Sequence, residues 1–172
     1  MSRLRHRLAS LLPTTGLLLA LLVAAGSVGC DKLFFAELKE NSRPEQPVFR
    51  IGSNPDFSGV GLVYEISIQG RPKELPPGAD TARSWHLFWD VRVDSGHRAA
   101  PVSEVTYGAP PVWLHDSRSA ESLPAGFIYE VDFHCLGLSP LVYFEIYADA
   151  AGKRRIRELT QDQWQRLTGP AR

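Results

Sequence analysis

Hydrophobic and polar residues alternate with a period of two along most of the chain after residue 47. This alternation is typical of half-buried β-strands. Residues 127–135 and 141–149 show it, and shorter runs predict strands at 48–51, 102–107 and 154–159. Residues 60–69 have an apolar face made of Val60, Leu62, Tyr64, Ile66 and Ile68. The clearest run is 84–94, where only Phe88 interrupts the apolar set of Trp85, Leu87, Trp89, Val91 and Val93.

Turn and helix signals complete the predicted fold. The strands at 127–135 and 141–149 should pair as an antiparallel hairpin, and the charge of residues 154–159 suits an edge strand. Thr160 to Gln163 have the form of a helix capping box, and Gly169 and Pro170 end that segment. A helix this short needs tertiary support, so Trp164 and Leu167 are expected to pack on a sheet. We predict a mainly β protein, a small antiparallel β-sandwich of the immunoglobulin-like type with a short C-terminal helix.

The first thirty residues differ in composition from the rest of the chain. Arg3, Arg5 and Arg7 come first, and no further Asp, Glu, Lys or Arg appears before Asp31. The densest apolar stretch, residues 17–25, is nine residues long. A membrane-spanning helix needs roughly 20 apolar residues, so the layout favours a signal peptide over a permanent span.

Residues 26–30, Gly-Ser-Val-Gly-Cys, resemble the lipobox of bacterial lipoproteins. Gly29 is the small residue directly before Cys30, whereas Ser27 stands where the family prefers Leu. The resemblance implies cleavage before Cys30, attachment of a diacylglyceryl group to its sulfur, and acylation of the new amino terminus. Asp31 resembles a signal for retention on the inner membrane, although the choice between inner and outer membrane stays open. The alternatives are an ordinary signal peptide with a coincidental Cys and an uncleaved anchor.

This assignment divides the chain into three parts. Residues 1–29 form the signal peptide, residues 30–47 a lipid-anchored tether, and residues 48–172 the β-sandwich domain. In the tether, Phe34 and Phe35 lie beside the membrane and are expected to reach its interface. Charged residues and two prolines, Pro44 and Pro47, follow and should hold the domain away from the bilayer.

Composition and charge exclude several classes of function. The 172 residues fit one domain and little else, and Lys plus Arg equal Asp plus Glu at 19 each. Removal of residues 1–29 leaves 143 residues with 16 basic and 19 acidic side chains, a formal charge of −3. Such a chain has no basic field for nucleic acid. With Cys30 lipidated, Cys135 has no partner for a disulfide within the chain and should be a buried, inert thiol.

No residue pattern indicates catalysis, a metal site or a cofactor. His134 and Cys135 are neighbours on a predicted strand, so their side chains should point to opposite faces and form no dyad. The histidines after Cys30, namely His86, His97, His115 and His134, have none of the spacings of a metal motif. Carboxylates on strand faces could serve glycoside hydrolysis, but a solvated face would carry them as well: Glu65, Asp90, Asp94, Glu130, Asp132 and Glu145.

The best candidates for contact residues surround the predicted loop of residues 108–122. Trp113 follows two prolines and is expected to be exposed, and Tyr107 and His115 lie close to it in sequence. Trp85 and Trp89 share an apolar stripe and should belong to the core instead. A ligand- or carbohydrate-binding module that uses this loop is therefore an alternative function. A hydrolase built from His115 and the strand carboxylates is a third.

A second, weaker resemblance covers residues 105–131. A Tyr-Gly turn closed by Pro, and then Leu-x-x-Gly before a strand that contains Tyr129, resemble small uncharacterised bacterial envelope proteins. That resemblance implies a β-sandwich and no known active site, and some proteins of similar design are proposed immunity lipoproteins that intercept toxins. We expect a lipid-anchored, non-enzymatic protein-interaction or structural module that faces the periplasm, with an unknown protein partner and no cofactor.

Overall fold

A computed structural model of the chain describes residues 34–54, 56, 59–94, 99–135 and 139–169. The chain divides into two compact units, Met1–Asp31 and Lys32–Arg172, and every described residue belongs to the second. The predicted signal peptide and Cys30 lie outside the described residues. Within the described ranges, no helix has the length and apolar character needed to cross a membrane.

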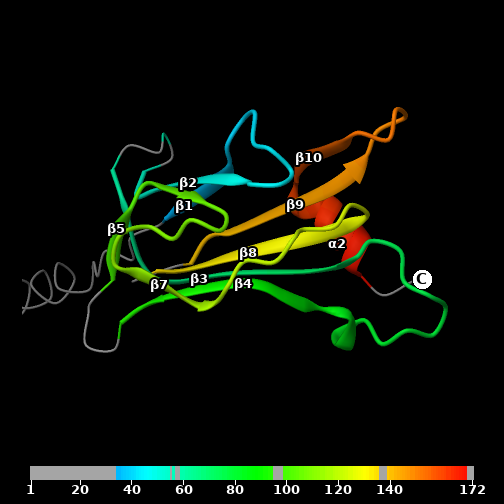
Figure 1. Cartoon of the computed structure of the whole chain (residues 1–172), viewed down its shortest axis with the longest axis horizontal. Coiled ribbons are helices and arrows are strands. Elements are labelled where there is room, and N and C mark those ends of the chain that lie inside the picture. The colour runs from blue at the N-terminus through cyan, green and yellow to red at the C-terminus, as the bar shows by residue number, and fades with distance from the viewer. Residues whose placement is uncertain (1–33, 55, 57–58, 95–98, 136–138, 170–172) are drawn as a thin grey trace, which may run out of the picture. The chain divides into compact units, whose positions relative to one another are not determined.

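Ten strands form two antiparallel sheets in the described part of the chain, as Figure 1 shows. The small sheet has the order β1-β2-β6, with strands at Phe35–Leu38, Val48–Gly52 and Glu104–Thr106. The large sheet has the order β10-β9-β8-β3-β4-β7, with β5 paired beside β3. Its strands are β3 (Gly61–Pro72), β4 (His86–Val93), β5 (Ala100–Val102), β7 (Leu114–Arg118), β8 (Phe127–Cys135), β9 (Leu141–Ala148) and β10 (Arg154–Leu159).

The predicted small β-sandwich is confirmed. Its sheets have three and seven strands, whereas an immunoglobulin constant domain has four and three. Aromatic side chains join the two layers: the Phe49 ring of β2 lies 6.2 Å from Phe133 of β8 and 5.7 Å from Phe144 of β9, centroid to centroid. All three rings are fully buried in the main core, and this inter-sheet contact excludes water from the space between the layers.

The predicted apolar face of β3 is wrong at its beginning. Val60 and Tyr64 are 44% and 38% exposed, whereas Val63 is fully buried. The pairing of β3 with β8 shifts between Val63 and Glu65, so Tyr64 is an extra residue without a partner in the ladder. Such a β-bulge reverses the alternation, and the buried set continues at Ile66 and Ile68 as predicted.

A similar irregularity explains the break at Phe88 in β4. Ile68 of β3 pairs with Trp89, but the next residue, Gln69, pairs with Leu87. Phe88 is therefore the extra residue, and both Phe88 and Trp89 are buried. Trp85 precedes β4 and packs in a second cluster against Trp164, with ring centroids 5.5 Å apart. The two tryptophans of the predicted stripe thus belong to different clusters.

The interpretation of residues 30–47 as a tether is corrected by β1. Phe35–Leu38 pair with β2, and Phe34 just before them is buried in the main core rather than placed for a membrane interface. Ala36 and Leu38 also pack against that core, because alternate residues of β1 face inward. The described fold therefore begins by residue 34, close to Cys30 in the sequence.

The strand β7 lies inside the segment predicted to be a loop, residues 108–122. Only Leu114 of its five residues is buried, so the strand has no apolar alternation to reveal it. The single strand predicted at 102–107 is in fact two. β5 pairs with β3 of the large sheet, and β6 pairs with β2 of the small sheet.

The predicted helix is confirmed as α2 (Gln161–Thr168). The Thr160 hydroxyl accepts a hydrogen bond from the Gln163 N–H at 3.3 Å, and the Gln163 side-chain oxygen accepts one from the Thr160 N–H at 2.8 Å. Trp164 stacks on Tyr143 of β9 at 4.3 Å between ring centroids, and Leu167 packs against the same cluster. The helix therefore covers one end of the outer face of the large sheet.

Removal of the Thr160 cap should destabilise the domain. The substitution Thr160→Ala leaves the Gln163 N–H without its side-chain acceptor, and we expect a loss of about 1 kcal/mol in the free energy of unfolding. Thr81 is a matched control because it precedes the short 3-10 helix η1 (Ala82–Ser84) and makes no side-chain capping bond. Urea unfolding measures both variants. Equal stabilities of Thr160→Ala and Thr81→Ala would contradict the capping assignment.

Candidate functional site

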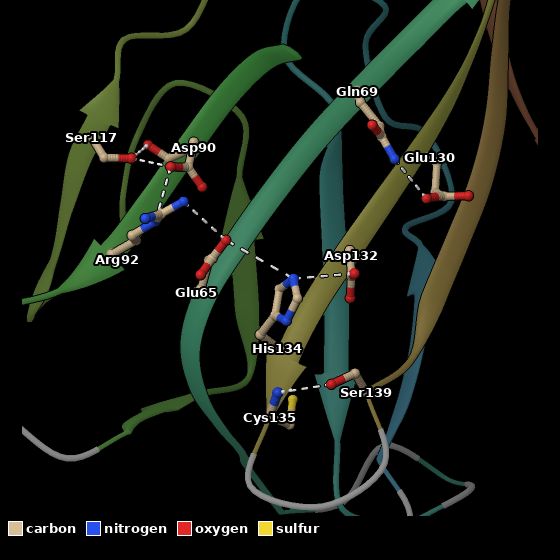
Figure 2. Close-up of polar contacts among 10 residues, drawn as sticks. All are labelled: Glu65, Gln69, Asp90, Arg92, Ser117, Glu130, Asp132, His134, Cys135 and Ser139. Atoms are coloured by element: carbon tan, nitrogen blue, oxygen red, sulfur yellow. Dashed lines mark hydrogen bonds and ion pairs between the residues drawn. The ribbon is translucent and has the colours of Figure 1, made fainter. Parts of the chain in front are cut away.

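Polar side chains gather on the outer face of the large sheet, opposite the core. The pairing register aligns them in rows across three strands: Glu65 of β3 lies between Arg92 of β4 and His134 of β8. In the next row, Ser67 of β3 lies between one aspartate of β4 and one of β8. Six of these side chains are linked by ion pairs and hydrogen bonds, and Gln69 and Glu130 form a separate pair beside them. We call the eight together the polar array (Figure 2): Glu65, Gln69, Asp90, Arg92, Ser117, Glu130, Asp132 and His134.

His134 is held between two carboxylates in this array. Its Nε2 lies 3.1 Å from Asp132 Oδ2 and 3.9 Å from Glu65 Oε1. The ring of Tyr64 lies 5.9 Å from the His134 ring, centroid to centroid. The bulge at Tyr64 permits this contact, because Tyr64 and Glu65 both reach the outer face.

Arg92 joins Glu65 to a further carboxylate, that of Asp90. Its Nη2 lies 3.3 Å from Glu65 Oε1, and its Nε lies 3.1 Å from Asp90 Oδ2. Asp90 is only 4% exposed, and the hydroxyl of Ser117 on β7 donates to its carboxylate. Ion pairs and hydrogen bonds within the array thus hold these side chains in place.

Two carboxylate oxygens of the array retain hydrogen-bonding capacity. Asp90 Oδ1 and Asp132 Oδ1 are buried and have no hydrogen-bond partner among the described residues. Glu130 accepts a hydrogen bond from Gln69 Nε2 at 2.9 Å, yet burial raises the pKa of Glu130, and this outweighs the opposing effect of that bond. The array therefore presents buried acceptors as well as exposed charges.

The array contains no nucleophile paired with a base among the described residues. The Ser117 hydroxyl donates to Asp90 rather than to an imidazole, and His134 Nε2 lies beside the carboxylates of Asp132 and Glu65. Burial raises the pKa of the Cys135 thiol to about 12, which keeps it neutral at physiological pH. No three His, Cys, Asp or Glu residues are grouped as metal ligands in the part of the chain that the structure describes.

The predicted contact residue Tyr107 is corrected by the structure. Tyr107 is buried, and its hydroxyl donates hydrogen bonds to the main-chain oxygens of Glu121 at 2.6 Å and Phe88 at 3.2 Å. Burial also raises the pKa of Tyr107 to about 12. Its ring lies 5.4 Å from that of Trp89 in the core, so Tyr107 is a structural residue.

The other two predicted contact residues are at the surface. Trp113 is 62% exposed, as predicted, in the connection from β6 to β7. His115 begins the exposed part of β7, and its Nε2 lies 3.2 Å from Asp94 Oδ2. Neither belongs to the polar array. Their roles as contact residues stay predictions.

Two of the strand carboxylates considered for hydrolysis lie outside the array. Asp94 faces His115, and Glu145 of β9 is buried at the other end of the sheet, 2.9 Å from Lys73 Nζ. Glu65, Asp90, Glu130 and Asp132 are the four that gather. The array could have been found from the sequence only by aligning the outward residues of β3, β4 and β8, which requires their pairing register.

Loss of Arg92 should destabilise the fold measurably. The substitution Arg92→Ala leaves the buried Asp90 carboxylate with Ser117 but without its cation, and we expect a loss of about 1–2 kcal/mol in the free energy of unfolding. Arg83 provides a control, since its ion pair with Asp80 is fully at the surface and should contribute no more than about 0.5 kcal/mol. Chemical denaturation of both variants measures the difference. An Arg92→Ala protein no less stable than Arg83→Ala would contradict the array as a fixed network.

The chain was compared with protein-family models, with curated proteins and with solved structures. None of them matches. The function proposed below therefore depends on the residues of this chain alone.

Proposed function

We propose that this chain is a lipid-anchored protein of the bacterial cell envelope whose β-sandwich binds another protein and has no enzymatic role. The observation that carries the proposal is the Gly29-Cys30 pair at the end of a basic and then apolar leader. Two acyl chains on one residue provide stable membrane attachment. The position of the sandwich supports the proposal, because its first described residue, Phe34, follows the expected anchor by only four residues in the sequence.

The polar array supports a protein partner rather than a small molecule. It lies on an open sheet face that also carries the partly exposed rings of Tyr64 and His134 and the guanidinium of Arg92. Tyr and Arg are enriched among residues that dominate binding energy in protein interfaces. Because the array holds four carboxylates and the single guanidinium of Arg92, the expected partner carries complementary basic groups. An immunity role against a toxin and a structural role in the envelope are both forms of this proposal.

The alternative is a ligand- or carbohydrate-binding module that uses residues 108–122. The exposure of Trp113 favours it, because sugars stack on exposed aromatic rings. A glycan array discriminates between the two: the alternative expects binding that Trp113→Ala abolishes and Arg92→Ala retains. A protein-binding sandwich expects no glycan to bind at this loop.

Metabolic labelling with radioactive palmitate in a bacterial host tests the anchor. We expect label in the wild-type protein and a signal reduced to background in Cys30→Ala, because the thioether-linked group and the amino-terminal acyl chain both require that residue. Cys135→Ala is the matched control, since it removes the other cysteine of the chain and should retain the label. Absence of label from the wild-type protein, or its persistence in Cys30→Ala, would overturn the proposal.

A further inference from the structure

Two apolar side chains project from a tight turn at the beginning of β7. The Leu114 N–H donates to the Pro111 carbonyl at 3.0 Å, so Val112 and Trp113 are the two central residues of a four-residue turn. Val112 is 73% exposed and Trp113 62%, the highest values among the large hydrophobic residues that the structure describes as exposed. Leu114 is buried in the main core and fixes the turn to the sandwich.

Trp113 is an unusual residue for its place in this turn. Its φ of 77° lies in the left-handed region, where a side chain is strained by about 1–2 kcal/mol and where turns of this kind favour Gly or Asn. Because the indole is largely exposed, burial of its apolar area does little to offset this strain. Strain of this kind at an exposed residue is typical of functional positions.

The turn lies at the end of the sandwich where the chain enters from Cys30. Leu114 pairs with Val93 at the end of β4. Because β4 is antiparallel to β3, this end of β4 lies beside the beginning of β3. Gly61, the first residue of β3, pairs with β5, and the residue after β5 accepts a hydrogen bond from Ile51 at the end of β2. Phe35 at the start of β1 pairs with that same end of β2. β5 and the β1 entry point both lie at the left of Figure 1.

Covalent length brings this end of the sandwich close to the proposed anchor. Phe34 is part of the core, and only four peptide links separate it from Cys30. At about 3.5 Å per residue, Phe34 lies at most about 14 Å from Cys30. If the Cys30 sulfur carries acyl chains in a bilayer, an apolar turn at this end meets the headgroup region, which is several ångströms deep. Trp is enriched in that region because its ring is apolar and its N–H is polar.

We infer that Val112 and Trp113 insert into the headgroup region of the membrane that holds Cys30 and so form a second, weaker membrane contact of the domain. The inference depends on the proposed lipid anchor. The anchor and the turn are two attachment points on one rigid body, and together they restrict rotation of the sandwich about its lipid. The polar array then keeps a defined direction relative to the membrane surface.

Quenching of tryptophan fluorescence tests the inference on the full lipidated protein. The protein is reconstituted into phosphatidylcholine vesicles with or without brominated phosphatidylcholine, and flotation shows that it is bound. Trp113 is one of four tryptophans, so we expect bromine to remove up to roughly a quarter of the emission if the four emit equally. Trp113→Phe should abolish this bromine-dependent loss, whereas the control Trp85→Phe should retain it, because Trp85 packs against Trp164.

The outcomes distinguish failure of the membrane contact from failure of the proposed lipid anchor. Protein that floats with the vesicles but shows the same bromine quenching in wild type and Trp113→Phe overturns the membrane contact and leaves the lipid anchor intact. Protein that neither floats nor carries palmitate overturns both. A change in Trp113 fluorescence with soluble peptidoglycan fragments, without quenching by brominated lipid, overturns the membrane contact in favour of a carbohydrate site.

Discussion

A single extra residue in β3 determines which side chains reach the open face of the large sheet. Before the bulge at Tyr64, Val63 points into the core, and after it Ile66 does so. Strict alternation from Val63 would instead bury residue 65, one position earlier. Tyr64 and Glu65 consequently both face outward, beside Arg92 and His134. Without the bulge, every residue of β3 beyond this point would exchange faces, and the carboxylate of Glu65 would enter the core. The polar array exists because the hydrophobic core requires this change of phase.

Regular elements with their own local signals could be predicted from the sequence. β8 alternates without interruption from Tyr129 to Cys135, β10 is marked as an edge by its charge, and α2 has a capping box at one end and Gly169 at the other. These features depend on neighbours in sequence. The bulges at Tyr64 and Phe88 depend on the pairing of β3 with β8 and β4, so a pattern of period two cannot reveal them.

The short strands and the candidate site could not be predicted, because their reasons are tertiary. Phe34 looks like a membrane-interface residue in sequence, but β1 pairs with β2 and places it in the core. Tyr107 precedes a Gly-Pro-rich segment, yet its hydroxyl bonds buried carbonyl groups of β4 and of a later loop. In the sequence, the charged residues of the array look like those of any solvated face. Only the pairing register shows that Glu65 of β3 lies between Arg92 of β4 and His134 of β8. The exposure of Trp113 could be predicted, because the two prolines before it are a local signal.

The exposed turn and the polar array occupy different surfaces of the sandwich. If the chain is anchored as proposed, this separation affects how the array is oriented relative to the membrane. The turn at Val112 and Trp113 lies at an end of the strands, whereas the array lies on the face of the sheet, and a sheet face is parallel to its strands. With the strand ends against a bilayer, as we propose, the face would stand at a steep angle to the membrane and stay open to a partner from the side. The proposed lipid alone would leave the sandwich free to rotate and to bury the array against the membrane surface. A second contact at the strand ends would exclude that buried orientation, so the exposed and strained tryptophan fits the proposed protein-binding face elsewhere on the same domain.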